Sequence, residues 1–193
     1  MCLNSPYHNL CMRLFVGIPM AAAVIDELST ISLQLRSKED GLRWQTPESW
    51  HITLQFLGNT SREQYECAAA QLRTLNMPPV PIRLEGLSAF NRAGILIAAV
   101  TLTPELLLLQ ERVTTATAHC GFVAETRPYQ PHITLARGKG KGQQPGLLAL
   151  KIKLRHQPVF TRFSAREFLL YESFLGPAGS HYEVRERFSL GAG

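Results

Sequence analysis

The sequence has few charged residues and no long hydrophobic run. Asp, Glu, Lys and Arg make up 18% of its 193 residues, whereas 45% are hydrophobic. This balance excludes an intrinsically disordered chain, a collagen-like repeat and a coiled coil. No apolar run reaches the roughly 18 residues of a transmembrane helix, so we expect no membrane-spanning segment. At roughly 150 residues per domain, the length predicts one domain.

Cysteine is also scarce, with only Cys2, Cys11, Cys67 and Cys120. None of them forms a C-x-x-C pair, and two lie in expected helices. The pattern therefore indicates neither a disulfide framework nor a structural zinc site. We expect a cytoplasmic protein, because cysteines stay reduced in that compartment.

The N-terminal region allows two interpretations. Residues 1–11 show no periodicity and are predicted to be a flexible extension. The apolar stretch from Leu14 to Ile25 could be a signal peptide, or a buried strand followed by a helix that Pro19 opens. Its helical pattern continues to Leu35, well past a cleavage site, which favours the strand and helix.

From residue 13 onward, short strands alternate with amphipathic helices. Helices are expected near 20–36, 62–75 and 104–120. Ser61 and Gln64 are spaced as a capping box for the second helix, and Thr103 is the expected N-cap of the third. Strands are expected near 13–18, 42–45, 51–57, 80–88, 94–102, 132–136, 149–155, 165–174 and 181–187. The short, irregular connections exclude a doubly wound parallel sheet and predict an α+β fold with antiparallel sheets.

The most informative feature is a repeated tetrapeptide. The sequence His-Ile-Thr-Leu occurs at 51–54 and again at 132–135, each time after an arginine, an aromatic residue and a proline. Both copies have the composition of a strand. Because alternate side chains of a strand share a face, each copy presents its histidine and threonine on one face and buries its Ile–Leu pair on the other.

Two imidazoles and two hydroxyls around one cleft suit the hydrolysis of a phosphodiester. One imidazole can take a proton from water and the other can protonate the leaving oxygen, since an ordinary histidine pKa of about 6.5 lets both forms coexist near neutral pH. The hydroxyls can donate to the non-bridging oxygens, where charge builds up. This chemistry needs no metal and no other cofactor.

Two alternatives stay open for the histidines. Each could be a strand residue that is hydrogen-bonded to a backbone carbonyl, as a lone His-x-Thr usually is. They could also bind zinc, although neither motif contains a third histidine, cysteine or carboxylate.

On these residues the chain resembles the two-histidine phosphoesterase superfamily. Within it, the sequence is most similar to the bacterial and archaeal RNA 2′,3′-cyclic phosphodiesterases, once called LigT-like 2′-5′ RNA ligases. The paired H-x-T motifs carry the resemblance, together with the stretches 13–19, 51–58 and 127–137 and the ending from Leu170 to Phe188. The resemblance implies one bilobal domain over residues 12–193, with pseudo-twofold symmetry and one motif from each lobe facing a central groove.

The same resemblance implies a reaction and the residues that perform it. A terminal 2′,3′-cyclic phosphate of RNA would be hydrolysed to a 2′-phosphomonoester. By motif order, His51 would be the general acid that protonates the 3′ oxygen, and His132 the general base that activates water. Thr53 and Thr134 would hold the phosphoryl oxygens.

Further residues are expected to bind the substrate, which would be an RNA 3′ end or a nucleotide with a 2′,3′-cyclic phosphate. Arg137 would clamp the phosphate or sugar. Phe56 would stack on the terminal base or, alternatively, pack in the core. Tyr129 is the third residue expected to bind the substrate. Arg43 and Arg127 could also line the groove, although an exposed arginine is usually only solvated. We expect a monomer. The alternative functions are an RNA-end binding module without catalysis, and 2′-5′ ligation through the same site.

Overall fold

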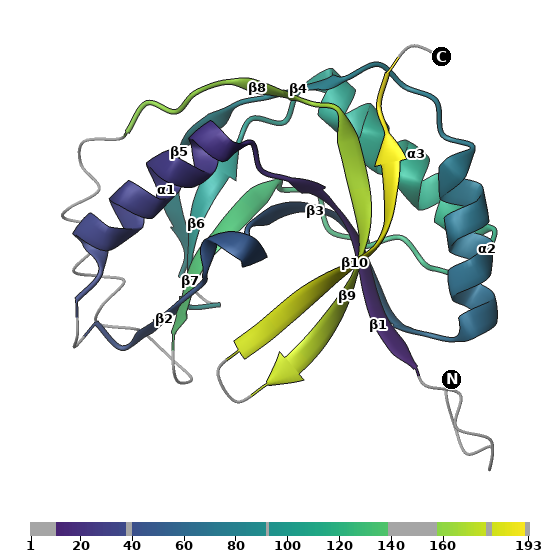
Figure 1. Cartoon of the computed structure of the whole chain (residues 1–193), viewed down its shortest axis with the longest axis horizontal. Helices are drawn as coiled ribbons and strands as arrows, with labels where there is room; N and C mark the ends of the chain where they lie inside the picture. The colour runs from purple at the N-terminus through teal and green to yellow at the C-terminus, as the bar shows by residue number, and fades with distance from the viewer. Residues whose placement is uncertain (1–10, 38–39, 92, 139–157, 177–178, 192–193) are drawn as a thin grey trace.

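The fold consists of antiparallel sheets and helices, as the computed structural model shows (Figure 1). The structure describes residues 11–37, 40–91, 93–138, 158–176 and 179–191. The helices are α1 (Ala22–Leu35), α2 (Arg62–Arg73) and α3 (Pro104–Ala118), with a 3-10 turn η1 (Pro47–Ser49). The strands are β1 (Met12–Pro19), β2 (Leu42–Trp44), β3 (His51–Thr60), β4 (Val80–Ile82), β5 (Leu84–Phe90), β6 (Ile95–Val100), β7 (His132–Gly138), β8 (Phe163–Ala165), β9 (Glu167–Gly176) and β10 (Gly179–Ser189).

Each of two four-stranded sheets contains one His-Ile-Thr-Leu strand. The first sheet has the order β10-β9-β1-β3, the second has the order β2-β7-β6-β5, and β4 pairs separately with β8. All of these pairings are antiparallel. The predicted α+β fold with two lobes is therefore confirmed. The strand expected near 149–155 and all but the last residue of the extension 1–11 lie outside the described residues.

The central strand β1 is buried on both of its faces. Leu14, Val16 and Ile18 pack into the main hydrophobic core. Phe15, which points the other way by strand alternation, forms a smaller buried cluster with Leu169 and Tyr171 of β9. The first sheet thus has an aromatic face as well as a face against the main core.

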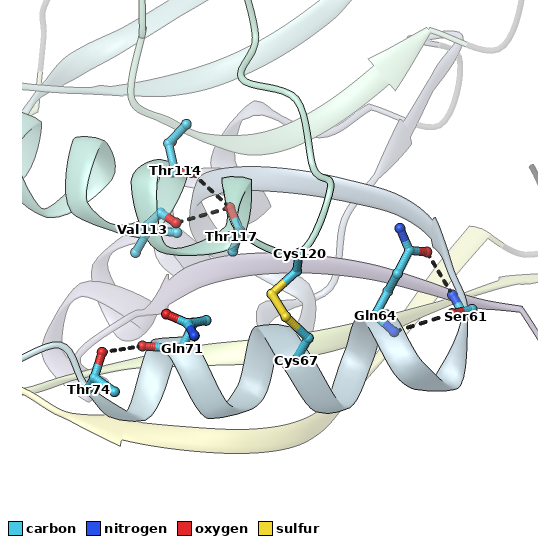
Figure 2. The surroundings of a disulfide bond; sticks show 9 residues. All are labelled: Ser61, Gln64, Cys67, Gln71, Thr74, Val113, Thr114, Thr117 and Cys120. Atoms are coloured by element: carbon cyan, nitrogen blue, oxygen red, sulfur yellow. Dashed lines mark hydrogen bonds between the residues drawn. A yellow bond between two sulfur atoms is a disulfide. The ribbon is translucent and has the colours of Figure 1, made fainter.

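The helices begin where their caps predict, with one exception. Gln64 N donates to Ser61 Oγ and Ser61 N donates to Gln64 Oε1, which is the predicted capping box of α2 (Figure 2). Thr103 caps α3 by accepting from the backbone of its first turn. The prediction that Pro19 opens α1 is wrong, because Pro19 pairs with His51 at the end of β1 and keeps the chain extended up to Ala21.

Helices α2 and α3 lie together on one side of the molecule, and a disulfide bond joins them (Figures 1 and 2). The bond links Cys67 of α2 to Cys120, so the expectation that the cysteine pattern indicates no disulfide is wrong. The two residues are 53 positions apart, and only the packing of α2 against α3 brings their Cα atoms to 5.8 Å. Next to the bond, buried Thr117 donates a 2.7 Å hydrogen bond to Gln55 Oε1, which attaches α3 to β3.

No helix among the described residues is long and apolar enough to cross a membrane.

We expect the Cys67–Cys120 bond to stabilise this arrangement of helices. The bond spans 53 residues, and in the chain-entropy model a loop of that length contributes about 4 kcal/mol by restricting the unfolded chain. The double variant Cys67→Ser/Cys120→Ser should lose a comparable free energy of unfolding in a urea titration. Dithiothreitol should destabilise the unsubstituted protein similarly and the double variant much less; equal stability of the two proteins would contradict this.

Candidate active site

The structure brings the two histidine strands together, one from each sheet. β3 contacts β7, and the positive charge of a protonated His132 acts on His51 strongly enough to lower its pKa. The guanidinium of Arg137 acts on both rings. Three predicted site residues therefore share one electrostatic environment.

Each imidazole is fixed by a hydrogen bond from its Nδ1 atom. His51 Nδ1 lies 2.8 Å from the Ser49 carbonyl oxygen, and His132 Nδ1 lies 2.7 Å from the Gln130 carbonyl oxygen. Because a carbonyl oxygen only accepts, each Nδ1 must carry its proton. The carbonyl-bonded histidine that we considered as an alternative is thus present, and it leaves Nε2 of both rings available for proton transfer.

Aromatic rings surround His51. Its ring centroid lies 4.5 Å from that of Phe15 and 5.7 Å from that of Tyr171, and Tyr182 meets it edge-on at 5.1 Å. Sequence reasoning assigned these rings no role, although Tyr171 and Tyr182 lie in the ending that carries the family resemblance. On the second sheet, Phe90 contacts the ring of His132 edge-on at 4.9 Å.

This packing lowers the pKa of both histidines. Desolvation is the main cause for His51 and brings its pKa to about 4, with the positive charges of His132 and Arg137 adding to the effect and the bond to Ser49 opposing it. Desolvation also lowers the pKa of His132, again with Arg137 adding to the effect and the bond to Gln130 opposing it. Both rings are therefore mainly neutral near pH 7 when no anion is bound.

An extra residue interrupts the alternation of each motif strand at the same point after its histidine. In β3, the pairing with β1 skips Leu54, since Gln55 is opposite Val16 and Thr53 is opposite Gly17. In β7, the pairing with β6 skips Leu135 in the same way. These β-bulges occupy matching positions, three residues after each histidine.

The bulges place the fifth residue after each histidine on the histidine side of its strand. Strict alternation would turn Phe56 and Arg137 to the opposite face, but an extra residue reverses the phase. Phe56 contacts Phe15, the ring that also packs on His51, and 71% of Phe56 is exposed. The alternative that Phe56 packs in the core is therefore wrong.

The two threonines have free hydroxyls within the described part of the chain. Thr53 and Thr134 are both partly exposed, and neither hydroxyl is hydrogen-bonded to a described residue. Tyr129, by contrast, uses its hydroxyl to donate a 3.0 Å hydrogen bond to the Thr53 carbonyl oxygen. This bond ties the segment before β7 to β3, and only the ring of Tyr129 remains for contact with a substrate.

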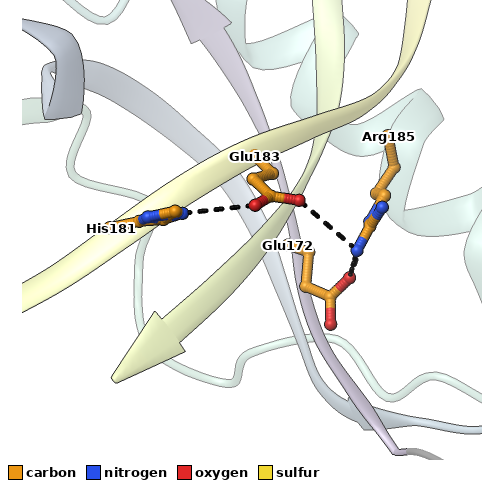
Figure 3. Close-up of polar contacts among 4 residues, drawn as sticks. All are labelled: Glu172, His181, Glu183 and Arg185. Carbon is orange, nitrogen blue, oxygen red and sulfur yellow. Dashed lines mark hydrogen bonds and ion pairs between the residues drawn. The ribbon is translucent and has the colours of Figure 1, made fainter. Parts of the chain in front are cut away.

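Polar contacts stabilise the strand that carries Tyr182 (Figure 3). His181 lies 3.4 Å from Glu183, Glu183 lies 3.6 Å from Arg185, and Arg185 pairs with buried Glu172 of β9. His181 and Glu183 flank Tyr182 and point away from it by alternation. The network therefore supports the β9–β10 hairpin from outside the site.

The two arginines that could line the groove differ in position. Arg43 lies directly opposite Arg137 on the neighbouring strand β2. Arg127 is exposed and pairs with Glu125 at 2.8 Å. The described residues contain no group of three or more histidine, cysteine or acidic side chains placed to hold a metal ion.

Known proteins share this architecture. A family model described as the 2′-5′ RNA ligase superfamily matches residues 19–172. An RNA 2′,3′-cyclic phosphodiesterase of Archaeoglobus fulgidus is 28% identical over 175 residues, covering 89% of this chain and 97% of that protein. The structure of E. coli LigT complexed with 3′-AMP has a TM-score of 0.76 at 23% identity and covers 93% of this chain and 98% of its own. A Thermus thermophilus protein has a TM-score of 0.77 at 26% identity, with 94% and 99% covered.

We expect Arg137→Gln to raise the pKa of both histidines, because the variant removes a positive charge that disfavours their protonated forms. In an NMR titration of the imidazole protons, His51 of the unsubstituted protein should titrate with a pKa of about 4. Both midpoints should move to higher pH in the variant. Arg127→Gln, which removes an exposed and paired arginine, is the matched control and should leave them in place. Identical midpoints in the Arg137 variant would refute the coupling.

We also expect Gly17→Ala to disturb the first motif, because β1 passes close to His51 at this residue. A Cβ on Gly17 would lie 2.9 Å from the Ile52 carbonyl oxygen and 3.5 Å from His51 Cδ2. Overpacking of this kind typically costs about 1–3 kcal/mol. Urea unfolding should show this loss, whereas Gly191→Ala, which meets no atom within 4 Å, should be nearly neutral.

Proposed function

The chain belongs to the 2′-5′ RNA ligase superfamily, and from this premise we propose that it hydrolyses RNA 2′,3′-cyclic phosphates to 2′-phosphomonoesters. One observation carries the proposal. Two imidazoles on contacting strands of two sheets, each held through Nδ1, interact electrostatically with each other and with an arginine that pairs with no described carboxylate. The name of the Archaeoglobus relative supports this choice of reaction.

Two proton transfers accomplish the proposed reaction. Nε2 of His132 takes a proton from water as the water oxygen attacks the phosphorus. The bond between the phosphorus and the 3′ oxygen breaks, and Nε2–H of His51 gives its proton to that oxygen. The products are a free 3′ hydroxyl and a 2′-phosphomonoester. A strained cyclic diester and two histidines suffice, so the mechanism we propose uses no metal ion.

The acid role of His51 depends on the substrate. A pKa of about 4 leaves the free ring neutral near pH 7. An anionic phosphate beside the ring favours the protonated form and raises the pKa. Binding of the substrate therefore supplies the acid in its charged state, while His132 stays neutral and able to accept a proton.

The remaining predicted residues act on the bound nucleotide. The hydroxyls of Thr53 and Thr134 donate to the non-bridging oxygens, together with the guanidinium of Arg137. The exposed ring of Phe56 stacks on the terminal base. Tyr129 contributes its ring face, since its hydroxyl already holds the Thr53 carbonyl.

We also propose that the protein acts as a monomer in the cytoplasm. All of the proposed site residues come from one chain, so a second copy is not required. In that compartment the Cys67–Cys120 bond would be an exception, because a reducing cytoplasm opposes disulfide formation. RNA ends with a 2′,3′-cyclic phosphate are the partners.

We expect His51→Ala and His132→Ala each to lower kcat by roughly 10²–10⁴-fold, the usual contribution of a general acid or base. The assay follows conversion of an RNA oligonucleotide with a 2′,3′-cyclic phosphate into the 2′-phosphomonoester by chromatography. His119→Ala, which removes an exposed histidine after α3, is the matched control and should be fully active. EDTA should not inhibit the unsubstituted protein.

Other outcomes would decide against the proposal. Near-normal activity of either histidine variant would refute the assignment of roles. Tight binding of the cyclic-phosphate RNA without turnover would identify an RNA-end binding module. Loss of activity with EDTA would contradict the metal-independent mechanism.

A further inference from the structure

Two arginines are direct neighbours at the edge of the candidate site. Arg43 of β2 and Arg137 of β7 are cross-strand partners, an arrangement that puts Cβ atoms about 5 Å apart on the same face. Like charges in this position destabilise a sheet. The pKa of Arg137 is lowered mainly by burial, and the positive charge of Arg43 lowers it further. The free protein thus holds two repelling cations side by side.

No described residue neutralises either charge. Neither Arg43 nor Arg137 forms an ion pair or a hydrogen bond with another described side chain. Arg43 is exposed, whereas Arg137 is partly buried. An anion from outside the chain would relieve the repulsion between the two arginines. The positive potential of such a site also attracts anions from a distance.

Arg43 extends from the second sheet to the hairpin of the first. A Cβ on Gly179, the first residue of β10, would lie 3.8 Å from Arg43 Nε and 3.9 Å from its Cζ. The phenol of Tyr182 on the same strand interacts electrostatically with Arg137 and packs against His51. The Arg43 guanidinium therefore lies beside the site, next to the groups that would hold the reacting phosphate.

The reacting phosphate does not need this second arginine. A 2′,3′-cyclic phosphate carries one negative charge, and the proposed mechanism already places Arg137 and a protonated His51 beside it. In an RNA chain, the next negative charge is the phosphodiester on the 5′ side of the terminal nucleotide. A cation one strand away from Arg137 suits that second phosphate, and the arginine fork suits its two free oxygens.

We propose that Arg43 binds the phosphodiester on the 5′ side of the terminal nucleotide, so that the enzyme prefers oligonucleotide ends to mononucleoside 2′,3′-cyclic phosphates. This inference rests on the proposed function and adds a second phosphate subsite to it. Arg43 takes part in no bond-breaking step. Its contribution depends on whether the substrate contains that second phosphate.

The test compares two substrates on one variant. Arg43→Met keeps the aliphatic stem against Gly179 and removes the charge. With a dinucleotide that ends in a 2′,3′-cyclic phosphate, kcat/KM should fall about 10- to 100-fold, mainly through KM, as expected for loss of a charged hydrogen bond. With adenosine 2′,3′-cyclic phosphate, which lacks an internal phosphodiester, kcat/KM should change less than about twofold. The slope of log(kcat/KM) against log[salt] for the dinucleotide should flatten by about 0.7.

Control variants separate the subsite from general effects. Arg43→Lys keeps the charge and should restore most of the salt slope and part of the activity on the dinucleotide. Arg62→Ala removes one positive charge from the exposed surface of α2 and should affect neither substrate. Equal losses of kcat/KM on both substrates in Arg43→Met would assign Arg43 to the reacting phosphate or to the sheet contact and would overturn the inference. No loss of kcat/KM on either substrate would overturn it as well.

A binding measurement tests the second phosphate subsite independently of the proposed hydrolysis. Calorimetry with two products, the dinucleotide ending in a 2′-phosphate and adenosine 2′-phosphate, needs no turnover. Arg43→Met should weaken binding of the dinucleotide alone by about tenfold or more. If the unsubstituted protein hydrolyses neither cyclic phosphate, the proposed function fails, and this binding difference still decides whether the second phosphate subsite exists.

Discussion

The matching bulge in each motif strand determines which side chains lie on the same face as the histidine. A regular strand would present the residue four positions after each histidine, Gln55 in β3 and Ala136 in β7. An unpaired leucine at this point, Leu54 in β3 and Leu135 in β7, buries those two residues instead and places Phe56 and Arg137 on the histidine side of their strands. The same local irregularity thus gives one strand an aromatic ring and the other a cation, although the two tetrapeptides are identical.

Charge and burial act in the same direction on the histidine rings, since both lower the pKa of the imidazoles. His51 is packed among aromatic side chains, which removes water and disfavours a charged imidazole. Arg137 and Arg43 add positive charge with no carboxylate partner among the described residues. Without an anion, these neighbouring positive charges cost free energy. A bound phosphate turns the same charges into a favourable interaction. The proposed phosphodiesterase activity and the proposed second phosphate subsite both follow from this excess of positive charge.

The two motifs belong to different sheets, so contacts between distant segments must hold them in place. The hydroxyl of Tyr129 holds the carbonyl of Thr53 across 76 positions of sequence. Behind β3, the hydrogen bond from Thr117 to Gln55 attaches α3 to the motif strand, and the Cys67–Cys120 bond joins α3 to α2. The position of His51 thus depends on a support that extends into the helices.

The sequence alone determined the antiparallel α+β fold, the caps of α2 and α3, and the sharing of a strand face by each histidine and its threonine. These features depend on local propensity and on a repeat period of two. Tertiary structure decided the rest: the contact between the two histidine strands, the bulges that redirect Phe56 and Arg137, and the pairing of Cys67 with Cys120. A local pattern contains no information on register between strands or on helix packing across 53 residues, because those depend on how distant surfaces fit together.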